Sequence, residues 1–332
     1  MVFGAGTNRS RAMVRGTAAA AIAASVVLPL ARRRLRMPRV LVAAAVAAGP
    51  AGLAVLFPRT KLRDAALYAM QMWAFTIVHE LPYDDPDALR SRLRIRYPIR
   101  ADLALGGGEL PNLRLQRLLS RPGPVTLLDR ALAIVHWAWF AQPHAALAWI
   151  LVWRNESFVR AARQLAGAFD LGCAVYYAIP TAPPWWAAEN GYIADELARR
   201  AAPGEGQEAE AETVRLRRVM VEVGEEVWGD AWPGLYEALG GNPWAAMPSL
   251  HLATSLLAAM LLAEAAPGAG AVGYAYAAAL ALALLYLGEH YLVDLLAGVA
   301  LVACVRVGEP FFEPAALRVS AVVQRLERIA NG

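Results

Sequence analysis

Charged side chains are scarce in this sequence for a chain of its length. They make up 18% of the 332 residues, whereas 58% of the residues are hydrophobic, and the mean hydropathy is +0.37. The apolar residues gather in long runs rich in alanine and leucine, and charged loops separate the runs. This pattern excludes an ordinary soluble domain and is typical of a polytopic helical membrane protein.

The chain is also poor in lysine, cysteine and histidine. Every basic residue except Lys61 is an arginine, and no basic face alternates with exposed aromatic residues, so nucleic-acid binding is not indicated. Cys173 and Cys304 both lie inside apolar runs, where a packing role is favoured. With five histidines, no cysteine pair and no His-x-x-x-His spacing, the sequence predicts neither a metal site nor another cofactor.

The apolar runs predict an all-α fold, a polytopic membrane helical bundle with six core transmembrane helices and an N-terminal hydrophobic pair. We expect the pair at residues 16–31 and 40–57, after a disordered basic leader at 1–15. The six core spans are expected at 65–81, 124–152 (with a kink at Pro143), 157–179, 249–264, 271–288 and 290–307.

Polar stretches divide the chain into three predicted regions. Residues 1–64 form a basic N-terminus with one or two accessory hydrophobic segments, residues 65–307 a membrane domain, and residues 308–332 an amphipathic cytoplasmic tail. Within the membrane domain, we expect residues 82–123 to lie at the interface. Residues 187–241 are a polar insertion, whose Ala/Glu/Arg-rich middle predicts short helices on the membrane surface.

The distribution of arginines predicts the orientation of the chain. The turn at 154–163, the tail after Arg306 and the cluster at 59–63 agree on a cytoplasmic location, because cytoplasmic loops are enriched in basic residues. The arginine-rich link at 32–39 disagrees if the N-terminal pair is a simple hairpin. The three concordant sites predict that residues 242–251 and 288–294 face outside.

Those two stretches carry the candidate chemistry. Each lies at the edge of an apolar run, and His290 and Asp294 are four residues apart, so on a helix they share one face. A carboxylate there can accept the inner N–H of the imidazole, fix its tautomer and stabilise its positive charge. The alternative is a buried structural pair, which is disfavoured because ionisable residues inside membranes are usually functional.

The first stretch predicts a place for an anion. Ser249 precedes an apolar run and is expected to be its N-cap, which leaves backbone N–H groups near His251 directed at a bound anion. A phosphate there would have one histidine placed to attack it and another to protonate the leaving oxygen. A role for Ser249 as a plain cap is equally compatible with the pattern.

The motifs resemble a known family. Pro-Ser-Leu-His, ending at His251, and His-Tyr-Leu-Val-Asp, from His290 to Asp294, resemble the second and third signatures of the type 2 phosphatidic acid phosphatase superfamily. Residues 180–186, 242–251 and 288–294 are similar to its inositol-phosphorylceramide-synthase (aureobasidin-resistance) branch and the actinobacterial relatives of that branch. The resemblance covers roughly residues 65–307 and implies an enzyme of the bacterial plasma membrane.

The resemblance also implies a mechanism. His290 would attack phosphorus and form a phosphohistidine, while Asp294 orients and neutralises the ring. His251 would protonate the leaving oxygen and then deprotonate the incoming acceptor. The partners would be a phospholipid donor, a lipid or other alcohol acceptor and the bilayer.

Two departures from the superfamily pattern bear on the reaction. Superfamily phosphatases carry an arginine six residues before the third-motif histidine, and here that position is Leu284. The synthase branch also lacks it, which favours transfer of a phosphoryl or phospho-headgroup, with inositol phosphate suggested by resemblance alone. The alternative is a lipid phosphatase acting on phosphatidic acid or polyprenyl (di)phosphate. A lipid carrier or silent scaffold is disfavoured because the whole triad is present.

The remaining candidate residues are less specific. Arg114 and Arg121 match the first superfamily signature only in part. For both arginines, anchoring to lipid headgroups is favoured over direct catalysis. Trp185 and Trp186 are possible lipid contacts, with anchoring in the interfacial belt favoured over substrate stacking. The candidate phosphate contacts are Ser249, Arg114, Arg121 and Asn242.

Overall fold

The computed structural model describes residues 3–121, 123–200, 216–240 and 242–332. Across these residues the secondary structure is helical, apart from isolated β-bridges of Thr181 with Arg94 and with Ala245. The predicted all-α class is therefore confirmed. The prediction of surface helices in the middle of the insertion falls on residues 201–215, which lie outside the described part of the chain.

The chain divides into two compact units. One unit consists of residues 1–84, 147–170 and 304–332, and the other of residues 85–146 and 171–303. Three helices have residues in both units, and their bounds are α8 (Gln142–Trp153), α9 (Asn155–Ala178) and α17 (Leu292–Asn331).

The first unit begins with three helices that pack in chain order. These are α1 (Phe3–Ala31), α2 (Arg39–Leu56) and α3 (Lys61–Glu80), followed by the short 3-10 helix η1 (Leu81–Asp84). Helix α2 packs against both α1 and α3. The approach of α2 to α1 requires Gly52, because a Cβ there would lie 2.6 Å from the carbonyl oxygen of Ala18. Within the same unit, the amide of Gln71 donates to the Asp170 carboxylate at 2.9 Å.

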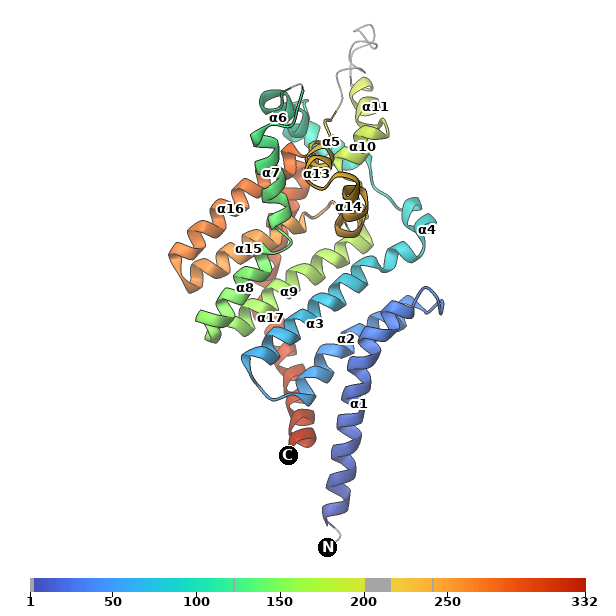
Figure 1. Cartoon of the computed structure of the whole chain (residues 1–332), viewed down its shortest axis with the longest axis vertical. Helices are drawn as coiled ribbons and strands as arrows, with labels where there is room; N and C mark the ends of the chain where they lie inside the picture. The colour runs from blue at the N-terminus through green and yellow to red at the C-terminus, as the bar shows by residue number, and fades with distance from the viewer. Residues whose placement is uncertain (1–2, 122, 201–215, 241) are drawn as a thin grey trace. The chain divides into compact units, whose positions relative to one another are not determined.

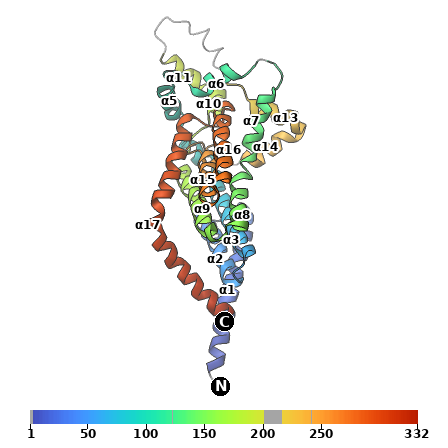
Figure 2. The same ribbon diagram turned by 90° about the vertical axis from the view of Figure 1, so that its left-hand side faces the viewer.

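The second unit contains the candidate site. Its N-terminal helices are α4 (Pro86–Ser91), α5 (Arg96–Leu105), α6 (Pro111–Leu119) and α7 (Leu127–Ala138). Helix α10 (Pro184–Glu189) overlaps the start of the insertion, which supplies α11 (Tyr192–Ala198), α13 (Val219–Trp228), the 3-10 helix η2 (Gly229–Ala231) and α14 (Trp232–Gly240). The apolar helices α15 (Leu250–Ala265) and α16 (Pro267–Tyr286) lie side by side (Figure 1 and Figure 2). Helix α16 also packs on α6 and α7, and α13 packs on α7.

Three of the described helices are long and apolar enough to cross a membrane. They are Asn8–Ala31, Arg39–Leu56 and Pro267–Tyr286, and Leu250–Ala265 is a shorter apolar helix. Both members of the expected N-terminal pair are among them. These helices indicate an integral membrane protein, whereas the six-span core stays a prediction.

Three boundaries differ from the sequence-based expectation. The predicted helix over 124–152 is two helices, α7 and α8, separated by a turn at 139–141. Pro143 lies in the first turn of α8, where its missing N–H breaks no intrahelical bond, so it begins a helix instead of kinking one. The predicted last span and the tail are one helix, α17, which continues through Pro310 and Pro314. Helix α1 begins at Phe3, so the described part of the expected leader is helical.

Candidate active site

The two motif histidines meet in the second unit. His251 is the second residue of α15, and His290 lies in the loop between α16 and α17. His251 Nδ1 is 3.0 Å from His290 Nε2, and the two rings are edge to face with centroids 5.2 Å apart. His290 Nδ1 is 3.5 Å from Asp294 Oδ2. The structure thus brings the three predicted triad residues together in the order His251, His290, Asp294.

The Asp294 carboxylate serves its own helix as well as the histidine. Asp294 is the third residue of α17 and is fully buried, and its Oδ2 accepts the backbone N–H of Tyr291 at 2.8 Å. Asp294 Oδ1 and His290 Nδ1 have no hydrogen-bond partner. A separation of 3.5 Å is longer than a normal hydrogen bond, and bonds of this kind often tighten when substrate binds. A small rotation of the buried imidazole would complete the bond.

A second carboxylate, Asp102 on α5, holds the start of α17. Asp102 is fully buried, and its two oxygens accept the backbone N–H groups of Leu292 at 2.7 Å and Val293 at 2.8 Å. Burial raises the pKa of Asp102 to about 6, the two N–H bonds oppose that rise, and the charge of Asp294 adds to it. These N–H groups would otherwise lack partners at the helix N-terminus. The beginning of α17 is therefore capped by Asp102 and Asp294 together.

Two amides on α6 hold the other side of the His290 loop. The Asn112 side chain donates to the carbonyl oxygens of Leu285 at 2.8 Å and His290 at 2.9 Å. The Gln116 side chain donates to the carbonyl of Tyr286 at 2.7 Å. Both amides are buried and, being four residues apart, lie on one face of α6. The loop that carries His290 is thus tied down on both sides by buried polar side chains.

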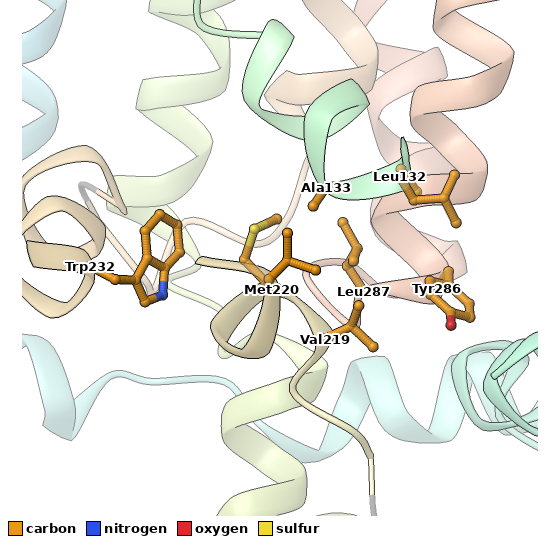
Figure 3. Packing of buried hydrophobic residues seen from close by; sticks show 9 residues of the cluster. Leu132, Ala133, Val219, Met220, Trp232, Tyr286 and Leu287 are labelled. Carbon is orange, nitrogen blue, oxygen red and sulfur yellow. The ribbon is translucent and has the colours of Figure 1, made fainter. Parts of the chain in front are cut away.

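Apolar packing holds the end of α16, from which the loop begins (Figure 3). A buried cluster joins Leu132 and Ala133 of α7, Val219, Met220 and Val223 of α13, Trp232 of α14, and Ala283, Tyr286 and Leu287 at the end of α16. The Tyr286 hydroxyl donates to Asp129 at 2.5 Å. Asp129 also completes a capping box with Thr126 at the start of α7. The insertion, through α13 and α14, is therefore part of the packing around the loop.

Ser249 connects the starts of α15 and α17. Its Oγ accepts the backbone N–H of Leu252 at 3.3 Å, so the predicted N-cap is confirmed. Its own N–H donates to the backbone carbonyl of Asp294 at 2.9 Å. Gly298 makes this approach possible, because a Cβ there would lie 2.7 Å from the Ser249 carbonyl oxygen. A phosphate contact of Ser249 stays a prediction.

The predicted arginine contacts lie elsewhere in the unit. Arg114 donates to Glu109 at 2.9 Å and to the Gly106 carbonyl at 2.9 Å, and its side chain is half exposed. Arg121 is exposed, and its carbonyl accepts a hydrogen bond from Arg217. These contacts do not join either arginine to the histidines, so their phosphate contacts stay predictions.

The other predicted contacts belong to loops beside the site. Asn242 is buried, and its Oδ1 accepts the backbone N–H of Trp244 at 2.9 Å. The backbone N–H of Trp185 donates to the carbonyl of Gly288 at 3.0 Å, two residues before His290. Trp186 stacks on Tyr192 and meets Trp244 edge to face. Trp185 is therefore tied to the His290 loop, and lipid contact by either tryptophan stays a prediction.

Glu289 occupies an environment that the sequence did not predict. Next to His290 in the sequence, Glu289 is expected to point off the catalytic face and lie at the interface, but one of its carboxylate oxygens, Oε1, is buried without a hydrogen-bond partner. Burial raises the pKa of Glu289 to about 7. The charges of Arg218 and His290 and the hydrogen bonds from Tyr236 and Trp185 lower the pKa, but by less than burial raises it. The Arg218 guanidinium lies 4.0 Å from the centroid of the Trp185 ring and pairs with Glu189. Residues of the insertion, among them Arg218 and Tyr236, thus lie around Glu289, the residue before His290.

Helix α7 brings two further rings to His251. His136 lies nearly parallel to the His251 ring, with centroids 5.0 Å apart. The ring centroids of Trp139, the residue after α7, and His251 are 4.1 Å apart, and the Trp139 indole N–H donates to the Thr254 hydroxyl at 2.9 Å. The sequence favours packing or an interfacial position for His136, and the spacing of α7 gives no indication of its distant partner.

This arrangement suits acid–base and nucleophilic chemistry on an anion. A ring nitrogen of His251 lies next to a ring nitrogen of His290, and the other ring nitrogen of His290 faces the buried carboxylate of Asp294. In this arrangement one ring can act as a nucleophile and the other as a proton donor. Among the described residues, no group of three or more histidine, cysteine or carboxylate side chains has the arrangement of a metal site.

Comparison with known proteins identifies the class. The PAP2 superfamily matches residues 102–307, which include the His251 and His290 motifs and more than half of the chain. The chain therefore belongs to the PAP2 superfamily, whose members are phosphatases and phosphotransferases that act on phosphorylated substrates. No curated protein and no solved structure matches the chain.

Proposed function

We propose that this chain is a membrane phosphotransferase that moves a phosphoryl or phospho-headgroup from a lipid donor to an alcohol acceptor. The observation that carries the proposal is the contact between His251 Nδ1 and His290 Nε2, with Asp294 behind His290. The PAP2 superfamily match supports chemistry at phosphorus. The apolar helices α1, α2 and α16 support a substrate that resides in the bilayer.

The first half-reaction breaks the bond between phosphorus and the leaving oxygen. His290 Nε2 attacks phosphorus, and the electron pair of the breaking bond stays on the leaving oxygen. His251 gives that oxygen a proton, while Asp294 stabilises the positive charge on His290. The contact between His251 and His290 must open for the phosphoryl group to enter between the rings.

The second half-reaction reverses these steps with a different oxygen. The acceptor hydroxyl loses its proton to His251 and attacks phosphorus, and the N–P bond breaks with its electron pair returning to His290. Water in place of the alcohol would give hydrolysis by the same route. The choice between transfer and hydrolysis therefore depends on which hydroxyl occupies the site.

Position 284 favours transfer. The Leu284 carbonyl accepts the N–H groups of Glu289 at 3.0 Å and His290 at 3.2 Å, so this residue lies beside the His290 loop. Its side chain is fully buried in an apolar cluster with Leu252 and Leu295. Superfamily phosphatases carry an arginine at this point of the motif, and the synthase-like branch that the chain resembles does not. We therefore propose that the chain belongs with that branch and that its donor carries an inositol-type headgroup.

The start of α15 supports a place for the phosphate charge. The positive end of a helix dipole and the N–H groups of its first turn favour a bound anion. His251 lies in that first turn, one residue after Leu250, and Ser249 caps the helix. The arginine distribution supports our proposal that this site faces the extracytoplasmic side of the plasma membrane.

The test is a transfer assay on the purified chain in mixed micelles. Headgroup-labelled phospholipids are incubated with and without candidate lipid alcohols, beside His290→Ala and the control His79→Phe. We expect a new labelled lipid that forms only with an acceptor, persists in the control and disappears in His290→Ala. Phosphate release without an acceptor would establish a phosphatase instead. No product from a broad lipid panel, or unchanged transfer by His290→Ala, would contradict the proposal.

A further inference from the structure

A third imidazole lies against the two motif histidines. His136 is 8% exposed, and it comes from α7, more than one hundred residues before His251 in the chain. Its ring is inclined by only 29° to that of His251, with centroids 5.0 Å apart. His251 Nδ1 is in turn 3.0 Å from His290 Nε2, so the three rings lie next to one another in the order His136, His251, His290.

His136 has an unused polar atom. Its Nδ1 is buried and has no hydrogen-bond partner. Most buried polar atoms in proteins have a partner, and each exception requires an explanation. A ring that served only to pack against His251 would be less costly as a phenylalanine, because burying an unpaired polar atom carries a desolvation cost. The unpaired, buried Nδ1 is therefore available for a hydrogen bond to a bound substrate.

The proposed reaction creates a need for such a donor. In phosphoryl transfer, negative charge is spread over three equatorial oxygens, which require positive or hydrogen-bonding groups. Leu284 supplies none. Arg114 is paired with Glu109, and Arg217 is paired with Asp129 and Glu222. A neutral imidazole can hold one N–H, which is sufficient for a hydrogen bond to a non-bridging oxygen.

We propose that His136 is a third catalytic histidine, whose Nδ1–H donates a hydrogen bond to a non-bridging oxygen of the transferred phosphoryl group. This inference rests on the proposed function and adds a contact to it. His136 keeps its proton throughout, so the proton balance between His251, the leaving group and the acceptor is unchanged. Its stacked ring also limits the rotation of His251 as that ring gives and regains a proton.

Three substitutions separate this role from packing. His136→Phe keeps a stacked ring and removes both nitrogens. His136→Asn places an amide N–H near the position of Nδ1, whereas His136→Gln places one near that of Nε2. His79→Phe is the matched control, because His79 also stacks on an aromatic ring, that of Phe75, but belongs to the other compact unit.

The measurements are kcat and KM for transfer, inhibition by orthovanadate and by inorganic phosphate, and the thermal midpoint in detergent. For His136→Phe we expect kcat to fall by about 100-fold with little change in KM, the loss typical of one transition-state donor. Inhibition by vanadate, a mimic of the trigonal-bipyramidal state, should weaken more than inhibition by phosphate. His136→Asn should retain most of the activity, and His136→Gln should resemble His136→Phe.

Each other outcome overturns the proposal in a distinct way. Wild-type kcat and vanadate inhibition in His136→Phe would exclude the contact while leaving the proposed function intact. An equal loss in all three variants, accompanied by a lower thermal midpoint, would show that His136 only packs. A wild-type protein that neither transfers, nor hydrolyses, nor binds vanadate would refute the proposed function and this inference together.

Discussion

Two sets of carboxylates, one in each compact unit, have different roles. In the second unit, Asp102 is fully buried and gives both oxygens to backbone N–H groups at the start of α17. In the first unit, Glu327 pairs with Arg59 and Arg63, and Glu309 pairs with arginines of α9. The first arrangement orders one loop, whereas the second joins helices through flexible side chains.

The difference has an energetic meaning. A buried N–H that loses its acceptor bears the full desolvation cost, but an exposed arginine that loses its partner is hydrated by water. Substitution of the buried cap Asp102 should therefore affect both folding and catalysis, and substitutions at exposed arginine pairs such as that of Arg59 should affect neither strongly. Three predictions test this contrast.

The largest effect is expected for Asp102→Ala. The substitution leaves the N–H groups of Leu292 and Val293 without an acceptor, and at about 1–3 kcal/mol each the loss of unfolding free energy is about 2–6 kcal/mol. The loop that carries His290 should also lose order, so kcat should fall more than KM changes. Thermal unfolding in detergent and steady-state transfer kinetics measure the two effects.

The control for that variant is Asp195→Ala in the same unit. Asp195 is mostly exposed and pairs with Arg96 at 3.3 Å, so its loss should change stability by less than about 0.5 kcal/mol. Equal effects of the two substitutions would remove the distinction between a buried cap and a surface pair.

An intermediate, pH-dependent effect is expected for Glu289→Gln. Burial raises the pKa of Glu289 to about 7, so the folded state binds this proton more tightly than the unfolded state. The ionised carboxylate therefore destabilises the fold increasingly as pH rises from the usual glutamate pKa to about 7. The thermal midpoint of Glu289→Gln, relative to wild type, should be higher at pH 8 than at pH 5. A difference of the opposite sign would show that the attraction of Arg218 outweighs burial.

The smallest effect is expected for Arg59→Gln. The Arg59 side chain is 60% exposed, and Glu327 keeps its contact with Arg63 at 2.8 Å when Arg59 is removed. The change in stability should be within about 0.5 kcal/mol, and transfer activity should be unchanged. A loss as large as that of Asp102→Ala would contradict the contrast between the units.

Local spacing predicted part of the candidate site. His290 and Asp294 lie one helical turn apart, and Ser249 precedes an apolar run, so their places at helix starts follow from short-range rules. The meeting of His251 with His290 was inferred from two apolar runs that end at the same membrane edge. The cap formed by Ser249 is confirmed, and the catalytic roles of the triad stay predictions.

The supporting residues were missed because their partners are distant in the chain. Asp102 and Leu292 are separated by 190 positions, and Asn112 and His290 by 178. The sequence does contain a partial signal, since Asn112 and Gln116 are spaced for one helix face and Asp102 adjoins the buried Leu103. Such spacing marks a polar residue as buried, but it does not say which backbone groups it contacts.

The sequence-based prediction was wrong at two helix boundaries near prolines. Pro143 was interpreted as a kink inside one helix, although a proline in a first turn fits the start of a new one. The last span was expected to end at residue 307, but α17 continues through Pro310 and Pro314 into the expected tail. Tertiary contacts of Glu309 with Arg163 lie beside this stretch and stabilise the helix where local propensity is weak.

The most direct test of the central claim is to trap the covalent intermediate. The chain is mixed with a lipid donor labelled at phosphorus, quenched in alkali within one turnover, and digested to locate the label. The account predicts an alkali-stable, acid-labile phosphohistidine at His290, absent in His290→Ala and discharged when an alcohol acceptor is added before the quench. Turnover without a labelled protein, or label on His251, would contradict the assignment of His290 as the nucleophile.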